Sequence, residues 1–220
     1  MMRRKLFENF AHPRGLWGRL AGQVMARTTA NVERGKWTLA ALDPGPDDRV
    51  LEVGYGPGLS LADACRRVHR GRVIGVDESS VMLRQARGRN AAPLRDGRLD
   101  LRVGDAQQLD ADLCGLDLIY GINVWQFWTD QAATIHDLAG RLRPAGRLAL
   151  VYMRPPGGST TADEAGERLQ KQFDHAGLAA VETRTMRFDP PAVMVIGHRP
   201  DRPHRSCQRV SASRAACASR

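Results

Sequence analysis

From about residue 49 onward, the chain alternates short β-branched runs with amphipathic stretches. Short apolar or alternating runs are typical of strands, whereas apolar residues at three- and four-residue spacings are typical of helices. This alternation predicts a parallel sheet with helices on both faces. The expected strands are residues 49–54, 72–77, 99–104, 116–122 and 146–153, and the expected helices are about 59–69, 79–90 and 130–142, the last ending at Pro144 and Gly146.

The order of elements changes after residue 153. A helical stretch at 161–177 is followed by two strand-like runs, AAVETRTMRF and AVMVIGHR, which only the turn residues DPP separate. A connection this short permits only a hairpin, so the last strand should run antiparallel to its neighbour.

The two ends of the chain differ from this central domain, which we place at residues 49–199. Residues 1–48 carry apolar residues at helical spacing, including a second helix expected at 31–42, and we predict that they form an N-terminal helical lid. Residues 200–220 are rich in arginine and poor in large apolar residues, which predicts a basic disordered tail.

The position of the charge limits the possible partners. Residues 1–49 carry a net +4 and residues 199–220 a net +5, which accounts for the whole formal charge of +9. Residues 50–198 are therefore neutral, which disfavours specific nucleic-acid binding by the central domain. We expect a cytoplasmic protein with reduced cysteines, because the four cysteines lack paired spacing and no signal peptide or membrane span of ~20 apolar residues is recognisable.

The stretch LEVGYGPG (51–58) places three glycines after a strand and before a helix. Such glycines can simply allow tight packing, but at the carboxyl end of a parallel strand they also let a ligand approach the backbone. A dinucleotide fingerprint reads G-x-G-x-x-G, and here the third glycine comes one residue too early. Glu52 would repel a pyrophosphate and would suit a ligand with an ammonium or sulfonium group.

Two carboxylates follow at the ends of the next strands. Asp77 can accept hydrogen bonds from ribose hydroxyls, although it could equally cap the following helix. Asp105, in VGDAQQL, can accept a hydrogen bond from an adenine amino group. Together with the glycine turn, these residues indicate a nucleoside site.

The segments LEVGYGPG, VIGVDES, VGDAQQL, LDLIYGINVWQFW and LRPAGRLAL resemble, in order and separation, the motifs of class I S-adenosylmethionine-dependent methyltransferases. The resemblance covers about residues 49–199. It implies a Rossmann-like α/β fold with a seven-stranded, mostly parallel sheet whose last strand is antiparallel. It also implies S-adenosyl-L-methionine as cofactor and implies no metal.

The resemblance assigns roles to matching positions. Glu52 and the glycine turn would line the methionyl end of the cofactor, Asp77 would hold the ribose, Asp105 the adenine, and Asn123 would contact the methionyl portion and the acceptor. The full set of implied cofactor residues is Glu52, Gly54, Tyr55, Gly56, Gly58, Asp77, Glu78, Ser79, Asp105, Ala106 and Asn123.

Methyl transfer is chiefly a matter of positioning, so the motifs name no obligatory catalytic residue, and His12 is only a weak candidate base. Aromatic residues 125, 127 and 128 should pack against the N-terminal helices or line an apolar pocket for a small acceptor. Two alternatives stay open at this point: an NAD(P)-dependent oxidoreductase, and a non-catalytic binding protein on the same fold. The acceptor atom and the oligomeric state are not specified by the sequence.

Overall fold

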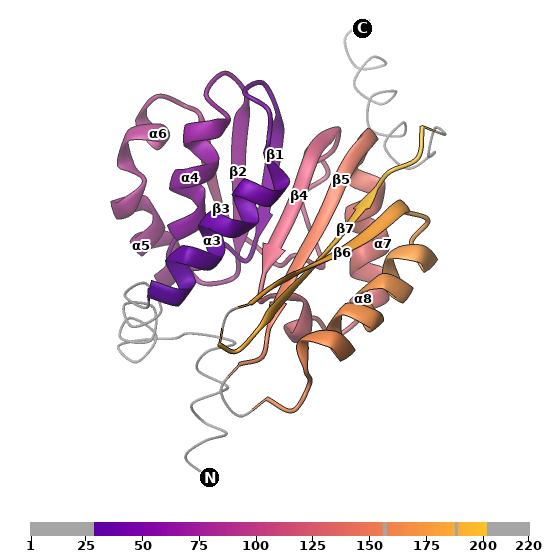
Figure 1. Cartoon of the computed structure of the whole chain (residues 1–220). Helices are drawn as coiled ribbons and strands as arrows, with labels where there is room; N and C mark the ends of the chain where they lie inside the picture. The colour runs from indigo at the N-terminus through magenta and orange to yellow at the C-terminus, as the bar shows by residue number, and fades with distance from the viewer. Residues whose placement is uncertain (1–28, 156–157, 188, 202–220) are drawn as a thin grey trace, which may run out of the picture.

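The computed structural model describes residues 29–155, 158–187 and 189–201. Its centre is a seven-stranded sheet in the order β3-β2-β1-β4-β5-β7-β6 (Figure 1). Strands β1 to β5 pair in parallel, and β7 runs antiparallel to both β5 and β6. The predicted α/β fold with a reversed last strand is confirmed. The strands are β1 Arg49–Val53, β2 Arg72–Asp77, β3 Leu99–Val103, β4 Leu116–Ile122, β5 Leu142–Met153, β6 Ala179–Met186 and β7 Ala192–His198.

Helices cover both faces of this sheet and enclose two apolar cores (Figure 1). Alternate residues of β1 face opposite ways, so that Leu51 joins the core under α7 and α8 while Val50 joins the core under α3, α4 and α5. We refer to these as the α7/α8 core and the α3/α4/α5 core. The helices are α3 Thr29–Leu42, α4 Leu59–Arg67, α5 Ser80–Arg89, α6 Ala91–Arg95, α7 Gln131–Arg141 and α8 Ala162–His175, with a 3-10 turn η1 at Trp125–Phe127.

Hydrogen bonds join the C-terminal end of helix α3 to strands β5 and β6. The carbonyl of Ala41 accepts a hydrogen bond from Arg184 Nη1 at 2.9 Å, and that of Leu42 accepts one from Arg147 Nη1 at 2.6 Å. The last turn of α3 contains no basic residue of its own. The positive charges that complement the C-terminal end of this helix therefore come from β6 and β5.

The boundary between α7 and β5 differs from the prediction. The helix ends at Arg141 and β5 begins at Leu142, so Pro144 and Gly146 lie inside a strand with an irregular register rather than after a helix. Gly146 allows this path because a Cβ there would lie 2.7 Å from the carbonyl oxygen of Leu116. The short helix α6, which Asn90 separates from α5, was also not predicted.

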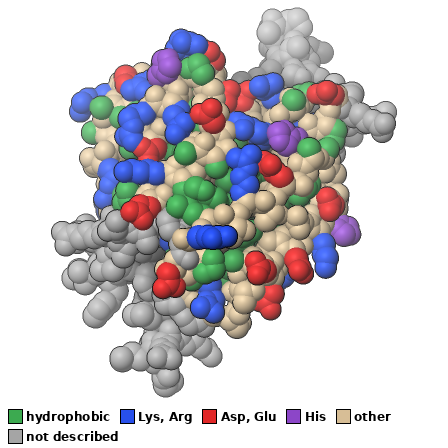
Figure 2. Space-filling model, viewed as in Figure 1, with side chains coloured by type: hydrophobic (Ala, Val, Ile, Leu, Met, Phe, Trp, Pro, Cys, Tyr) green, Lys and Arg blue, Asp and Glu red, His purple; other side chains and the backbone are tan. Residues whose placement is uncertain are grey.

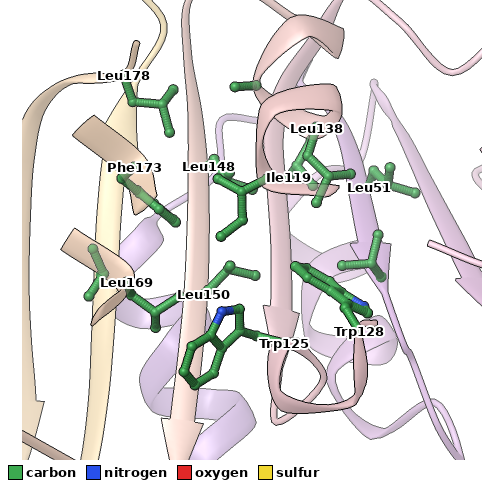
Figure 3. Close-up of a cluster of buried hydrophobic side chains, with 14 of the residues drawn as sticks. Leu51, Ile119, Trp125, Trp128, Leu138, Leu148, Leu150, Leu169, Phe173 and Leu178 are labelled. Atoms are coloured by element: carbon green, nitrogen blue, oxygen red, sulfur yellow. The ribbon is translucent and has the colours of Figure 1, made fainter. Parts of the chain in front are cut away.

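The two tryptophans after β4 pack on the face of the sheet that α7 and α8 cover. Trp125 and Trp128 lie in the α7/α8 core, 2% and 8% exposed, between the sheet and the helices that carry Leu138 and Leu169 (Figure 3). Trp125 meets Tyr152 edge-on, with ring centroids 5.9 Å apart. These two tryptophans do not pack against α3, which covers the other face of the sheet, whereas the rest of the predicted N-terminal segment lies outside the described residues.

Several expectations fall partly or wholly outside the described residues: residues 1–28 of the lid predicted at 1–48, residues 202–220 of the tail predicted at 200–220, and His12. Acidic and basic side chains are interspersed on the face shown in Figure 2. Within the described ranges, no helix is both long and apolar enough to cross a bilayer.

Candidate functional site

The glycine turn lies at the carboxyl-terminal end of β1. Gly54, Gly56 and Gly58 adopt φ angles of +70°, +52° and +77°, in the left-handed region that favours glycine. A Cβ on Gly54 would lie 2.1 Å from Val124 Cγ1, and one on Gly58 would lie 2.8 Å from Ala86 Cβ. A Cβ on Gly56 would meet no atom of the described residues within 4 Å. The outer glycines therefore permit close packing, whereas Gly56 borders open space.

Asp77, the last residue of β2, lies directly against this turn. Its Oδ2 accepts a hydrogen bond from the Gly56 amide at 2.8 Å, and its Oδ1 accepts one from the Ser79 amide at 2.9 Å. Burial raises the pKa of Asp77, although both hydrogen bonds oppose that shift. Ser79 caps α5 through Met82 N, and Glu78 is exposed. Each carboxylate oxygen keeps a second lone pair with which it can accept a ligand hydroxyl.

The loop after β3 lies beside Asp77, because the amide of Gly104 donates to the carbonyl of Asp77 at 3.1 Å. Asp105 Oδ1 accepts from the Gln107 amide at 2.8 Å, and Ala106 packs against the α7/α8 core. The side chain of Gln107 then accepts hydrogen bonds from the loop that precedes α7. Asp105 is thus held at the same edge of the sheet as Asp77.

Asn123 follows β4 and extends its pairing with β5. Its amide donates to the carbonyl of Val151 at 2.8 Å, and its Oδ1 accepts from the Met153 amide at 2.7 Å. The residue has a φ of +55°, which asparagine tolerates better than most residues. Asn123 therefore lies at the edge of the sheet between the ends of β4 and β5, and its contact with a cofactor stays a prediction.

The side chain of Tyr55 lies elsewhere. It is 3% exposed in the α3/α4/α5 core, over Gly75, and its hydroxyl donates to the carbonyl of Arg102 at 3.3 Å. Burial raises the pKa of this phenol. Only the backbone of Tyr55 takes part in the turn, where its carbonyl accepts from the Gly58 amide.

Comparisons with known proteins show which proteins this chain resembles in sequence and fold. A family described as "Methyltransferase domain" matches residues 50–146. An uncharacterized methyltransferase, YdaC of Bacillus subtilis, is 25% identical over 174 residues, which is 78% of this chain and 92% of YdaC. A solved S-adenosylmethionine-dependent methyltransferase of Aquifex aeolicus superposes with a TM-score of 0.66 at 15% identity, covering 82% of this chain and 98% of that one. The chain therefore resembles methyltransferases in sequence over residues 50–146, and it shares the fold of a solved S-adenosylmethionine-dependent methyltransferase.

A further relative is the trans-aconitate 2-methyltransferase of Azoarcus sp.. It is 36% identical over 124 residues, which is 56% of this chain but only 44% of that enzyme. The likeness to this enzyme is thus confined to part of a longer protein. The solved structure from Aquifex aeolicus, at 15% identity, shows a shared fold alone.

Within this methyltransferase fold, Glu52 lies beneath the turn rather than in it. Its carboxylate is fully buried, accepting from the Ser60 hydroxyl at 2.5 Å and from the Tyr120 hydroxyl at 2.7 Å. Burial raises the pKa of Glu52 to about 7, and the two hydrogen bonds lower it only in part. The predicted contact of Glu52 with the methionyl end stays a prediction; in the structure its carboxylate joins β1, β4 and the start of α4.

The raised pKa of Glu52 predicts a pH-dependent stability. The folded protein binds a proton that the unfolded chain releases between pH 4.5 and about 7, so stability is greatest below this window and falls as the pH rises through it. A shift of this size corresponds to about 3 kcal/mol. We expect Glu52→Gln to remove the dependence, so that urea unfolding finds the variant more stable than the wild type at pH 8 but not at pH 4.5. An equal loss of stability at both pH values would contradict this.

Sequence reasoning missed one support of the turn. Asn90 is 2% exposed, and its Nδ2 donates to the carbonyls of Gly58 at 2.9 Å and Ala86 at 3.0 Å. Its position 32 residues beyond Gly58 gives no local signal of this contact.

No group of three His, Cys, Asp or Glu side chains suited to a metal occurs among the residues that the structure describes.

Proposed function

We propose that this chain is an enzyme that uses S-adenosyl-L-methionine to methylate a small, partly apolar acceptor. The observation that carries the proposal is the carboxylate of Asp77 hydrogen-bonded to the amide of Gly56 inside an open glycine turn. The relatives add support for a small acceptor, since trans-aconitate is named in one of them.

The residues at the edge of the sheet fit the cofactor that the family implies. The space beside Gly56 lets a ligand approach the backbone, and Asp77 adjoins that space with lone pairs available for two hydroxyls. Asp105 and Ala106 follow on the β3 side, and Asn123 on the β4 side. The nucleoside would therefore lie over β2 and β3, with the amino-acid end toward β1 and β4.

When bound, the cofactor supplies an electrophilic methyl group on a positively charged sulfur. The contribution of the protein is to hold donor and acceptor in line, which alone can lower a barrier by several kcal/mol. Asp77 and Asp105 would hold the nucleoside end. Asn123, whose side chain is fixed by the hydrogen bond from the Met153 amide, would border the site where β4 ends. We assign no general base, in keeping with an acceptor that is already a competent nucleophile.

The proposal is tested first by ligand binding. We expect S-adenosylhomocysteine, and not NADH, to raise the thermal unfolding temperature of the full chain. Stabilisation by NADH alone would favour the oxidoreductase alternative. The third glycine of the turn, which comes one residue too early for a dinucleotide fingerprint, argues against that alternative.

The second test separates an enzyme from a non-catalytic binding protein. The full chain is incubated with methyl-labelled cofactor and a panel of small acceptors that includes trans-aconitate, and labelled product is counted. Binding of S-adenosylhomocysteine without turnover of any acceptor would favour the non-catalytic alternative.

A further inference from the structure

Arg34, on the inner face of α3, is a buried cation that meets no acidic side chain among the residues that the structure describes. The residue is 3% exposed, and its Nε has no hydrogen-bond partner within those residues. Its Nη2 donates to the thioether sulfur of Met153 at 3.0 Å, which is a weak acceptor. Burial lowers the pKa of the guanidinium to about 10, so the group is still charged at neutral pH.

Other arginines in the described chain have the hydrogen-bond acceptors that Arg34 lacks there. Arg199 is also buried and its Nε likewise lacks a partner, but its Nη1 donates to the carbonyls of Gly140 and Leu142. Arg102 pairs with three aspartates from β3 and the loop after it. A charge that is buried without such compensation is strongly unfavourable, and an arginine left in this state suits a planar anionic ligand.

The position of Arg34 relates it to the methyltransferase site. Its guanidinium meets the side chain of Met153, whose amide holds Asn123. The next residue on α3, Gly35, lies against Ser60 at the start of the helix that follows the glycine turn. Arg34 therefore lies near the ends of β4 and β5, on the side of the site opposite to Asp105.

We propose that Arg34 binds a carboxylate group of a ligand at this edge of the sheet. Two ligands in the proposed reaction offer that group: an acidic methyl acceptor, and the amino-acid end of the cofactor. The inference rests on the proposed function, because it assumes that a donor and an acceptor meet beside Asn123. The inferred site differs from the motif-based one because the residue that binds the carboxylate lies on α3, outside the five sequence motifs.

The test compares Arg34→Met, which keeps the apolar stem, with Arg34→Lys, which keeps the charge. Arg147→Met serves as the matched control, because Arg147 supports the opposite end of α3 without approaching the site. Calorimetry measures the affinity of each protein for S-adenosylhomocysteine and for its decarboxylated analogue. Binding of trans-aconitate and of other di- and tricarboxylates is then measured with S-adenosylhomocysteine present at saturation.

If the cofactor supplies the carboxylate, Arg34→Met should bind S-adenosylhomocysteine at least tenfold more weakly, with an unchanged affinity for the decarboxylated analogue. If the acceptor supplies it, S-adenosylhomocysteine should bind normally and carboxylate binding should be lost. In both cases Arg34→Lys should recover part of the affinity, and Arg147→Met should behave as the wild type. Arg34→Met should also unfold at the wild-type temperature or above it, because an uncompensated charge has been removed.

Three results would overturn the inference. The first is an Arg34→Met variant whose affinities all match the wild type, including the case in which the wild type binds no carboxylate beyond S-adenosylhomocysteine. The second is an equal loss of affinity for S-adenosylhomocysteine and its decarboxylated analogue. The third is a loss of stability and binding that Arg147→Met reproduces. A wild type that fails to bind S-adenosylhomocysteine would instead reject the proposed function itself.

Discussion

Replacing Asp77 with alanine should weaken the binding of S-adenosylhomocysteine by about 100-fold or more. The substitution removes the acceptor for the Gly56 and Ser79 amides, and with it the group expected to hold the ribose. Each charge-assisted hydrogen bond to a ligand hydroxyl contributes ~1.5–3 kcal/mol, and two such bonds account for this loss. Calorimetric titration of the full chain measures the effect directly.

Asp105→Ala should show a smaller loss, because one hydrogen bond to the adenine is expected there. Asp96→Ala is the matched control, since Asp96 is an exposed partner of Arg98. Wild-type affinity in both the Asp77 and the Asp105 variants would show that the nucleoside site is misplaced.

Replacing Gly54 with alanine should lower the free energy of unfolding by about 3 kcal/mol. The left-handed backbone costs an alanine ~1–2 kcal/mol, and the contact with Val124 adds a further ~1–3 kcal/mol of overpacking. The loop after β4 would also move, because Val124 adjoins Asn123. Chemical denaturation of the variant and the wild type measures the difference.

Gly56→Ala gives this prediction a control within the same turn. It carries a similar backbone strain at φ +52°, but its methyl group would meet no neighbour in the described part of the chain, so its cost to stability should be only ~1–2 kcal/mol. Its methyl group would project into the space beside Asp77 and should reduce cofactor binding more than stability. Equal destabilisation by the two substitutions would mean that Gly54 is not closely packed.

Much of the fold could be predicted because its pattern is local. Strand runs and helix spacings are properties of neighbouring residues, and the DPP turn after β6 forces the reversal of β7. The start of β5 was missed because Pro144 usually ends secondary structure, whereas here the strand passes it with an irregular register. The side on which Trp125 packs depends on which face of the sheet α8 covers, and no local pattern carries that information.

The candidate site divides in the same way. The glycines and Asp77 could be found because a nucleoside requires such residues at the ends of consecutive strands. Arg34, Asn90 and the Tyr120 partner of Glu52 could not, because they reach the site from segments distant in sequence. Each is recognisable only from burial and from the atoms that it contacts.

The two arginines that cap α3 have a consequence for how the chain is made. The carbonyls of Ala41 and Leu42 leave the ribosome long before Arg147 and Arg184, which are more than a hundred residues further on. During translation, the helix that bears Arg34 therefore lacks both counter-charges until β5 and β6 have been synthesised. The first described helix becomes fully anchored only when the hairpin near the end of the domain closes, so docking of α3 should be among the last steps of folding on the ribosome.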